Sequence, residues 1–104
     1  MIMIEGVKIS LGGTEYVVPA LSFKQLRNLQ PKLATLGTVK GIPSEAQLDA
    51  VAEVVHAALS RNYPDLTLDQ VGDMLDLTNM KHIVPAIMGI SGLVSEGEAL
   101  AGKS

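Results

Sequence analysis

The sequence predicts an α+β fold, mostly α, with an N-terminal β-hairpin followed by a small bundle of three to four helices. Three observations support this prediction. Two β-rich runs flank a Gly-Gly pair, three segments open with a helix-capping motif, and only three of the 104 residues are aromatic, so the core must be aliphatic. We expect one globular domain over residues 1–92, with the hairpin at 6–19 and the helical part at 22–91. A flexible tail is expected at 93–104.

The hairpin is predicted from the alternation of apolar and polar residues over 7–11, a period of two that is typical of a half-buried strand. Gly12 and Gly13 follow. Two glycines between such runs favour a tight turn, because that turn requires positive φ angles. Pro19 ends the second run, since proline cannot donate to the strand ladder. An isolated hairpin is marginal in water, so its apolar face must rest on the helices.

Three helix starts carry the same motif, a Ser or Thr followed three residues later by Gln, at 22–25, 44–47 and 67–70. In this capping box the hydroxyl and the Gln side chain satisfy amide groups at the helix start. Each cap contributes about 1 kcal/mol. The motif therefore predicts helices that begin at residues 23, 45 and 68.

Apolar periodicity extends these starts to four helices, at 23–36, about 45–60, about 68–75 and about 79–90. The first has an apolar stripe that begins with Phe23, and Pro31 should kink or divide it. The second has the clearest 3.6-residue period and includes Leu48 among its apolar positions. For the fourth we expect Thr78 as the cap, with Pro85 either bending the helix or lying near its start.

Charge is distributed unevenly along the chain, although the net charge is only −3. Residues 1–40 contain five basic and two acidic residues, whereas residues 41–104 contain three basic and nine acidic residues. Ordinary solvated faces are one interpretation. The other is that the two halves attract each other, within one chain or head-to-tail between copies. An acidic total argues against nucleic acid as the main partner.

No segment predicts export or insertion into a membrane. Residues 1–4 are too short for a signal-peptide core, and Glu5 follows them. The longest uncharged apolar run, 83–94, is too short to cross a bilayer and contains proline and glycine. We therefore expect no membrane partner and a cytoplasmic location.

No set of residues predicts catalysis, a cofactor or a metal site. His56 should lie at the edge of the core and His82 in solvent, and neither has an assignable nucleophile or acid partner. Four aspartates follow one another at intervals of three or four residues: Asp65, Asp69, Asp73 and Asp76. They lack the spacing of a calcium loop, and acidic residues near a helix start interact favourably with its dipole without any ligand. The expectation is a protein that is not an enzyme.

Residues 7–93 resemble the tail assembly chaperones of long-tailed bacteriophages. The resemblance rests on the order of four segments: VKISLGG with Glu15-Tyr16, PALSFKQLR at 19–27, AALSRNYPDLT at 57–67, and LDLTN at 75–79. The stretch NYPDLT is its most characteristic part. The resemblance implies a non-enzymatic protein of the bacterial host cytoplasm. Such a protein coats the tape-measure protein, keeps it soluble, promotes polymerisation of the tail-tube protein around it and is absent from the mature virion.

The resemblance also implies a longer form made by a −1 ribosomal frameshift, for which Gly102 and Lys103 are the candidate codons. The predicted partner-binding surface is the basic side of the first helix, Lys24, Arg27 and Lys32, together with Tyr63. Tyr63 has a second interpretation, as a cover for the helix junction. Self-association is also plausible. Two other functions stay open: a permanent structural or connector protein of the phage tail, and a small helical protein-binding adaptor.

Overall fold

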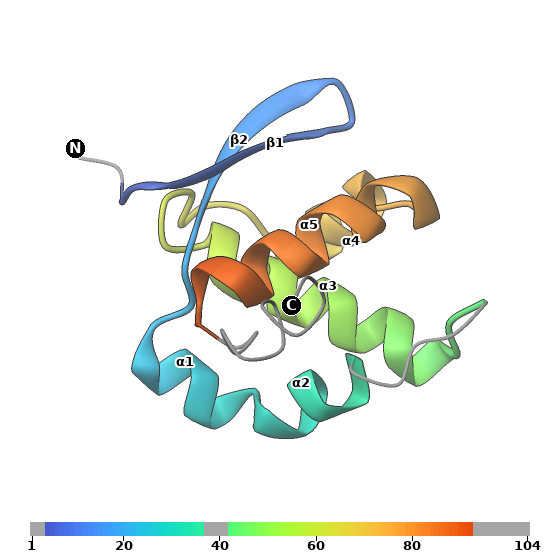
Figure 1. Ribbon diagram of the computed structural model, residues 1–104. Coiled ribbons are helices and arrows are strands. Elements are labelled where there is room, and N and C mark those ends of the chain that lie inside the picture. Colours follow the sequence, from blue (N-terminus) through green and yellow to red (C-terminus); the bar gives the residue numbers. More distant parts are fainter. Residues whose placement is uncertain (1–3, 37–41, 93–104) are drawn as a thin grey trace, which may run out of the picture.

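A two-stranded hairpin followed by five helices makes up residues 4–36 and 42–92, the parts that this computed structural model describes (Figure 1). The predicted α+β, mostly α class is confirmed. The helices number one more than expected because the first predicted helix is divided in two. The predicted tail at 93–104, with Gly102 and Lys103, lies outside the described residues.

The hairpin consists of β1 (Gly6–Leu11) and β2 (Thr14–Pro19), paired antiparallel from Gly6↔Pro19 to Leu11↔Thr14. Gly12 and Gly13 have φ angles of +58° and +86°, so they form the predicted tight turn. Pro19 is the last residue of β2, as its missing amide donor requires.

The first predicted helix divides into α1 (Phe23–Asn28) and α2 (Gln30–Leu36). Pro31 is the second residue of α2, a position where its missing amide donor breaks no helical hydrogen bond. The expectation that Phe23 belongs to the apolar stripe was wrong, since Phe23 is 87% exposed. The Gln25 side chain explains this outcome. Its Nε2 donates to the Ala57 carbonyl at 2.8 Å, which turns that side of α1 toward the bundle and Phe23 away from it.

Helix α3 (Glu45–Leu59) is the centre of the fold and supplies six of the buried core residues. Val51, Val54 and Val55 are at most 2% exposed. Leu48, an expected inward residue, is 45% exposed, which corrects that prediction. It belongs to the first turns of α3, where no other described element covers it fully.

The last two helices are α4 (Leu68–Met74) and α5 (Leu77–Ile90). The predicted cap of α5, Thr78, was wrong: Asp76 is the N-cap, and the helix begins at 77. Asp76 accepts a hydrogen bond from the Asn79 amide at 2.7 Å, and the Asn79 side chain accepts one from the Asp76 amide at 2.8 Å. Asp and Asn here replace the Ser/Thr and Gln of the three predicted capping boxes, all of which the structure confirms. Pro85 lies inside α5.

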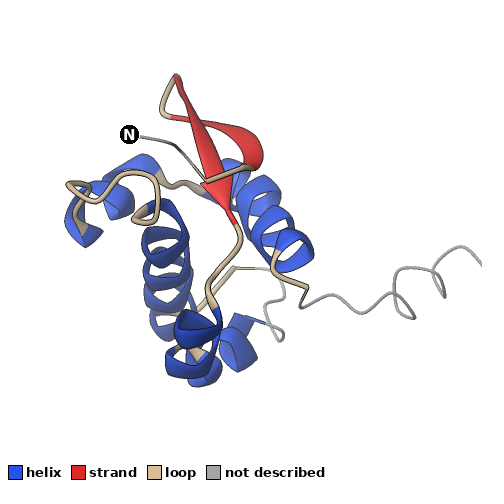
Figure 2. Ribbon diagram, turned by 90° about the vertical axis from the view of Figure 1, so that its left-hand side faces the viewer, coloured by secondary structure: helices blue, strands red, loops and turns tan. Residues whose placement is uncertain are grey.

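The hairpin lies across the helices, with β1 packed against α5 and β2 against α3 (Figures 1 and 2). Leu11 and Val18 point into the core and are at most 1% exposed. Each strand thus buries apolar residues on the helices, as an isolated hairpin requires.

Three consecutive residues of the loop after α3 fasten the hairpin to the helices, and we call Arg61, Asn62 and Tyr63 the hairpin clamp. Asn62 is 5% exposed. Its Oδ1 accepts from the Ile4 amide at 2.6 Å, and its Nδ2 donates to the carbonyls of Ile4 and Val17 at 2.9 and 3.1 Å. Tyr63 Oη accepts from the Val17 amide at 2.9 Å.

Arg61 completes the clamp, because its Nη1 donates to the Ala20 carbonyl at 2.6 Å, just beyond β2. Within the described ranges, every buried side-chain nitrogen and oxygen has a hydrogen-bond partner. The buried amide of Asn62 therefore costs little in the folded state, where all of its partners are in place.

Asn62→Ala should lower the free energy of unfolding by about 2–4 kcal/mol, because it leaves backbone groups of the hairpin without partners in a buried site. Asn28→Ala is the matched control: Asn28 is exposed at the end of α1, and its loss should change stability by less than about 0.5 kcal/mol. Urea unfolding followed by circular dichroism measures both. Equal losses for the two variants would contradict the role given to Asn62.

Gly6→Ala should also destabilise the fold, by about 1–3 kcal/mol, since a Cβ at Gly6 would overlap the Val18 carbonyl oxygen and lie 2.7 Å from Pro19 Cα. A Cβ at Gly89, in α5, would meet nothing within 4 Å. Gly89→Ala should therefore stabilise the protein by up to about 1 kcal/mol through helix propensity. Thermal unfolding of the two variants distinguishes a steric effect at β1 from a general effect of replacing glycine.

Candidate functional site

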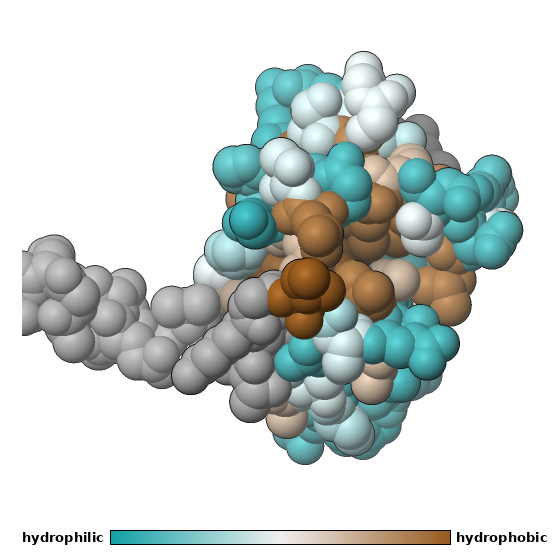
Figure 3. Space-filling view, turned by 90° about the vertical axis from the view of Figure 1, so that its right-hand side faces the viewer, coloured by the Kyte–Doolittle hydropathy of each residue, from teal (hydrophilic) through white to brown (hydrophobic). Residues whose placement is uncertain are grey.

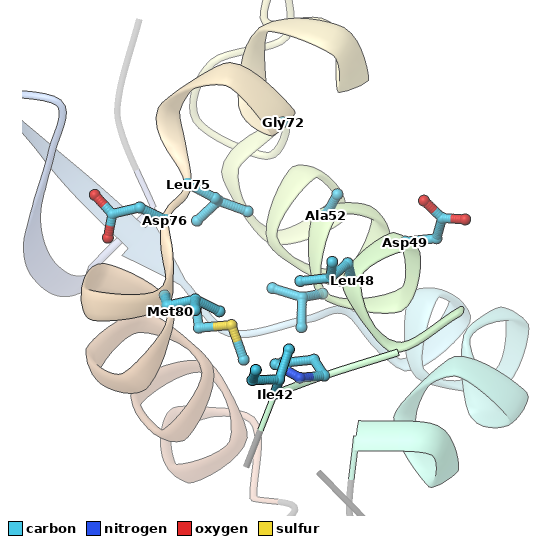
Figure 4. A pocket seen from close by; sticks show the side chains of 11 residues that line it. Ile42, Leu48, Asp49, Ala52, Gly72, Leu75, Asp76 and Met80 are labelled. Carbon is cyan, nitrogen blue, oxygen red and sulfur yellow. The ribbon is translucent and has the colours of Figure 1, made fainter. Parts of the chain in front are cut away.

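A groove of about 440 Å³ opens between α3, α4 and the start of α5, and we call it the apolar groove (Figure 4). Its lining is mostly aliphatic. The close view shows Leu48, Leu75 and Met80 around the hollow and Ile42 at its lower edge, while the carboxylates of Asp49 and Asp76 lie on opposite sides and point away from it. The site is thus apolar at its centre and acidic at its rim.

Several apolar side chains of the groove remain open to solvent. Ile42 is 87% exposed, Leu77 48% and Leu48 45%. The space-filling view shows hydrophobic side chains gathered on one face, with hydrophilic residues around them (Figure 3). A continuous exposed apolar surface with a polar border is typical of a binding site.

The groove lies beside the starts of α3 and α5, and α4 forms its third wall. Leu48 lies in the first turns of α3 and Leu77 is the first residue of α5, so both are beyond the part of each helix that the core covers. Gly72 of α4 also faces the groove, and a Cβ placed there would meet nothing within 4 Å. Sequence reasoning missed this site. The available signal was the presence of leucines at helix starts. There the apolar stripe of the helix continues, but no other described element packs over it.

Acidic residues concentrate beside the groove. A neighbouring hollow between α3 and α4 includes four acidic residues in its lining: Asp49, Glu53, Asp69 and Asp73. No basic residue is among the described residues that line either hollow. The acidic second half of the sequence thus places much of its charge on this face.

Asp65, Asp69, Asp73 and Asp76, the four aspartates considered above as metal ligands, have structural roles or lie in solvent. Asp76 caps α5, and Asp69 lies in the first turn of α4, where the helix dipole favours a negative charge. Among the described residues, no group of three or more potential ligands is close enough to hold a metal ion.

The predicted basic surface, Lys24 and Arg27 of α1 and Lys32 of α2, is only partly available to a partner. Lys24 and Arg27 are exposed. Lys32 Nζ lies 2.9 Å from Glu53 Oε2, an ion pair that links α2 to α3. Next to Arg27, a shallow hollow of about 300 Å³ is lined by Phe23, Leu26 and Leu33. The structure therefore adds an exposed aromatic residue to the predicted basic surface.

Tyr63 does not join that basic surface. Its hydroxyl group is bonded to β2, and its ring packs edge-to-face on Tyr16, with centroids 5.2 Å apart and an interplanar angle of 85°. The hollow beside it includes none of the three predicted basic residues. Of the two interpretations of Tyr63, the geometry favours the cover of a junction.

The two histidines lie where the sequence placed them. His56 is half-buried, and its Nε2 lies 2.9 Å from the Leu66 carbonyl, while His82 is exposed. None of the described helices has the length and apolarity that a membrane span requires.

Comparisons with protein-family models, with curated proteins and with solved structures find no match to this chain.

Tyr63→Phe should destabilise the protein by about 1 kcal/mol, because the Val17 amide loses its acceptor. Tyr16→Phe is the matched control: the Tyr16 hydroxyl donates to Met74 Sδ at 3.3 Å, and a thioether is a weak acceptor. Its loss should cost less than half as much. Denaturant unfolding compares the two variants, and an unchanged stability of Tyr63→Phe would contradict the structural role of Tyr63.

Proposed function

We propose that this chain is a non-enzymatic phage tail assembly chaperone that binds an apolar helical segment of the tape-measure protein in the apolar groove. The observation that carries the proposal is the set of apolar side chains exposed around that groove, Ile42, Leu48 and Leu77. They contribute little to the chain's own core, so they are available to cover apolar surface on another protein.

The position of the groove between three helices supports a helical ligand. Amphipathic helices commonly bind by laying an apolar face into a groove between helices, with anchors spaced at i, i+3, i+4 and i+7. The walls here are the capped starts of α3 and α5, which are fixed by hydrogen bonds at both caps. A groove with fixed walls loses little conformational entropy when it binds a ligand.

The acidic rim indicates which charge the ligand should carry beside its apolar face. Asp49 and Asp76 border the groove, and more acidic residues line the hollow next to it. A helix with lysine or arginine beside its apolar face would meet opposite charge along this rim, which favours both association rate and orientation. The partner segment is therefore an apolar helix with basic flanks.

The remaining parts of the proposal come from the family resemblance. They are action in the host cytoplasm, promotion of tail-tube polymerisation around the tape-measure protein, absence from the mature virion, and the frameshifted longer form. A connector protein of the tail is the main alternative. Mass spectrometry of purified particles separates the two functions, since a chaperone should be absent from them.

Leu77→Asp should abolish the solubilising effect on a co-expressed tape-measure protein, because a carboxylate would face the apolar ligand. Leu77 is the first residue of α5 and is 48% exposed, so the helix dipole favours Asp there and the fold should persist. The readout is the soluble yield of the long protein and its co-purification with this chain.

Leu68→Asp is the matched control, because Leu68 is the first residue of α4, is 44% exposed and lines the neighbouring acidic hollow, not the apolar groove; a further carboxylate there keeps the charge that the ligand's basic flanks would meet. It should retain most of the soluble yield. If the wild-type chain gives no soluble complex, the chaperone function is wrong. If both variants lose the complex equally, the groove is not the binding site.

A further inference from the structure

We propose that residues 93–100 of this chain dock on α1 of the same molecule and cover Phe23. The segment reads LVSEGEAL and follows the last described residue, Gly92. The surface that it covers consists of Phe23 and its two exposed basic neighbours, Lys24 and Arg27, and we call these three residues the Phe23 patch. This surface is separate from the apolar groove, and its proposed occupant does not depend on a tape-measure partner.

The Phe23 patch has no cover within the described residues. Phe23 is the chain's single phenylalanine and is 87% exposed. The hollow of about 300 Å³ beside it includes Leu26 and Leu33 in its lining. Lys24 and Arg27 are exposed, and neither forms an ion pair in the described ranges. An aromatic ring beside an apolar hollow, bordered by two cations, fits an apolar segment that carries negative charge.

Residues 93–100 have the composition that this patch requires. Three of them are large and apolar and two are glutamates: Leu93, Val94, Leu100, Glu96 and Glu98. The segment therefore carries two negative charges and no positive charge, whereas the Phe23 patch carries two positive charges. The apolar residues would cover the aromatic ring, and the opposite charges would favour docking in one orientation.

The end of α5 places the start of this segment next to the Phe23 patch. The Leu21 amide donates to Ser91 Oγ at 2.9 Å, so the C-cap of α5 lies against the link between β2 and α1 (Figure 1). Gly92, with a φ angle of +76°, ends the helix there. Leu21 and Phe23 are two residues apart, a distance of at most about 7 Å, whereas eight extended residues span up to about 26 Å. Residues 93–100 are thus long enough to cross the patch.

The covalent link to α5 makes a small contact sufficient. A short link between two surfaces gives an effective concentration in the millimolar range, so a contact with a dissociation constant below about 1 mM is occupied most of the time. The surface is also ordered before docking. Ser22 caps α1, and Gln25 Nε2 donates to the Ala57 carbonyl of α3 at 2.8 Å, so little entropy is lost when the segment binds. Another protein could then reach Phe23 only by displacing the segment.

A tryptophan reporter tests this docking, because the chain contains no tryptophan. Phe23→Trp places the reporter on the patch in the full-length chain, at a position exposed enough to accept the larger ring. Ile42→Trp is the matched control, since Ile42 is also 87% exposed but lines the apolar groove. Acrylamide quenching of each reporter is compared with and without four substitutions in the segment: Leu93→Ser, Val94→Ser, Glu96→Ser and Glu98→Ser.

The serine substitutions should raise the quenching constant of the Phe23→Trp reporter at least about twofold, because a tethered contact that is occupied most of the time is then lost. The quenching of the Ile42→Trp reporter should not change. Protection of the Phe23→Trp reporter should be independent of protein concentration, since the contact lies within one molecule. Thermal unfolding followed by circular dichroism confirms that each variant is folded.

Three results would overturn the proposal. One is equal quenching of the Phe23→Trp reporter with and without the serine substitutions. Another is protection that disappears on dilution, which would mean that a second molecule covers Phe23. The third is a change at the Ile42→Trp reporter alone, which would place the segment in the apolar groove.

Charge reversal checks the pairing of the two surfaces. In the Phe23→Trp chain, Glu96→Lys together with Glu98→Lys should weaken docking roughly two- to fivefold for each exposed charge pair that is lost, and quenching should rise. Adding Lys24→Glu and Arg27→Glu to that chain should restore protection, and absence of any restoration would overturn the charge pairing that the proposal requires. None of these residues lines the apolar groove, so the soluble yield of the tape-measure protein should be retained. Failure of the docking and failure of the chaperone function therefore give different results.

Discussion

The loop after α3 connects the two halves of this fold, and the position of the hairpin depends on it. Two strands alone are marginal in water, and their apolar residues need a helical surface to cover them. Asn62 supplies the specific attachment, because its buried amide is satisfied by Ile4 and Val17, which lie 58 and 45 residues away in the sequence. A buried amide is costly wherever such partners are missing, so alternative placements of the hairpin are disfavoured. The hairpin in turn covers α3 and α5.

The apolar groove forms where the packed elements leave apolar side chains uncovered. The core is aliphatic and centred on α3, where Val51, Val54 and Val55 are almost fully buried. Toward the start of that helix the apolar stripe continues to Leu48, but the covering elements do not close over it. The chain therefore has more apolar surface than its own fold buries, and part of this surplus, Ile42, Leu48 and Leu77, lies in the groove between carboxylates.

Basic and acidic residues are concentrated on different surfaces of the molecule. The basic residues of α1 and the acidic rim of the groove lie on different sides (Figures 1 and 4), and each is accompanied by exposed apolar side chains.

Local signals in the sequence determined the hairpin, its Gly12-Gly13 turn, the three Ser/Thr–Gln caps and the class of fold, because each depends on residues that are close together in the sequence. They failed at Thr78, the predicted cap of α5, because Asp76 caps that helix together with Asn79. Tertiary structure alone decided that Phe23 points outward, that Tyr63 serves the hairpin and that an apolar groove exists. Periodicity identifies the apolar side of a helix, but whether that side is covered depends on where distant elements end. Only the packed structure contains that information.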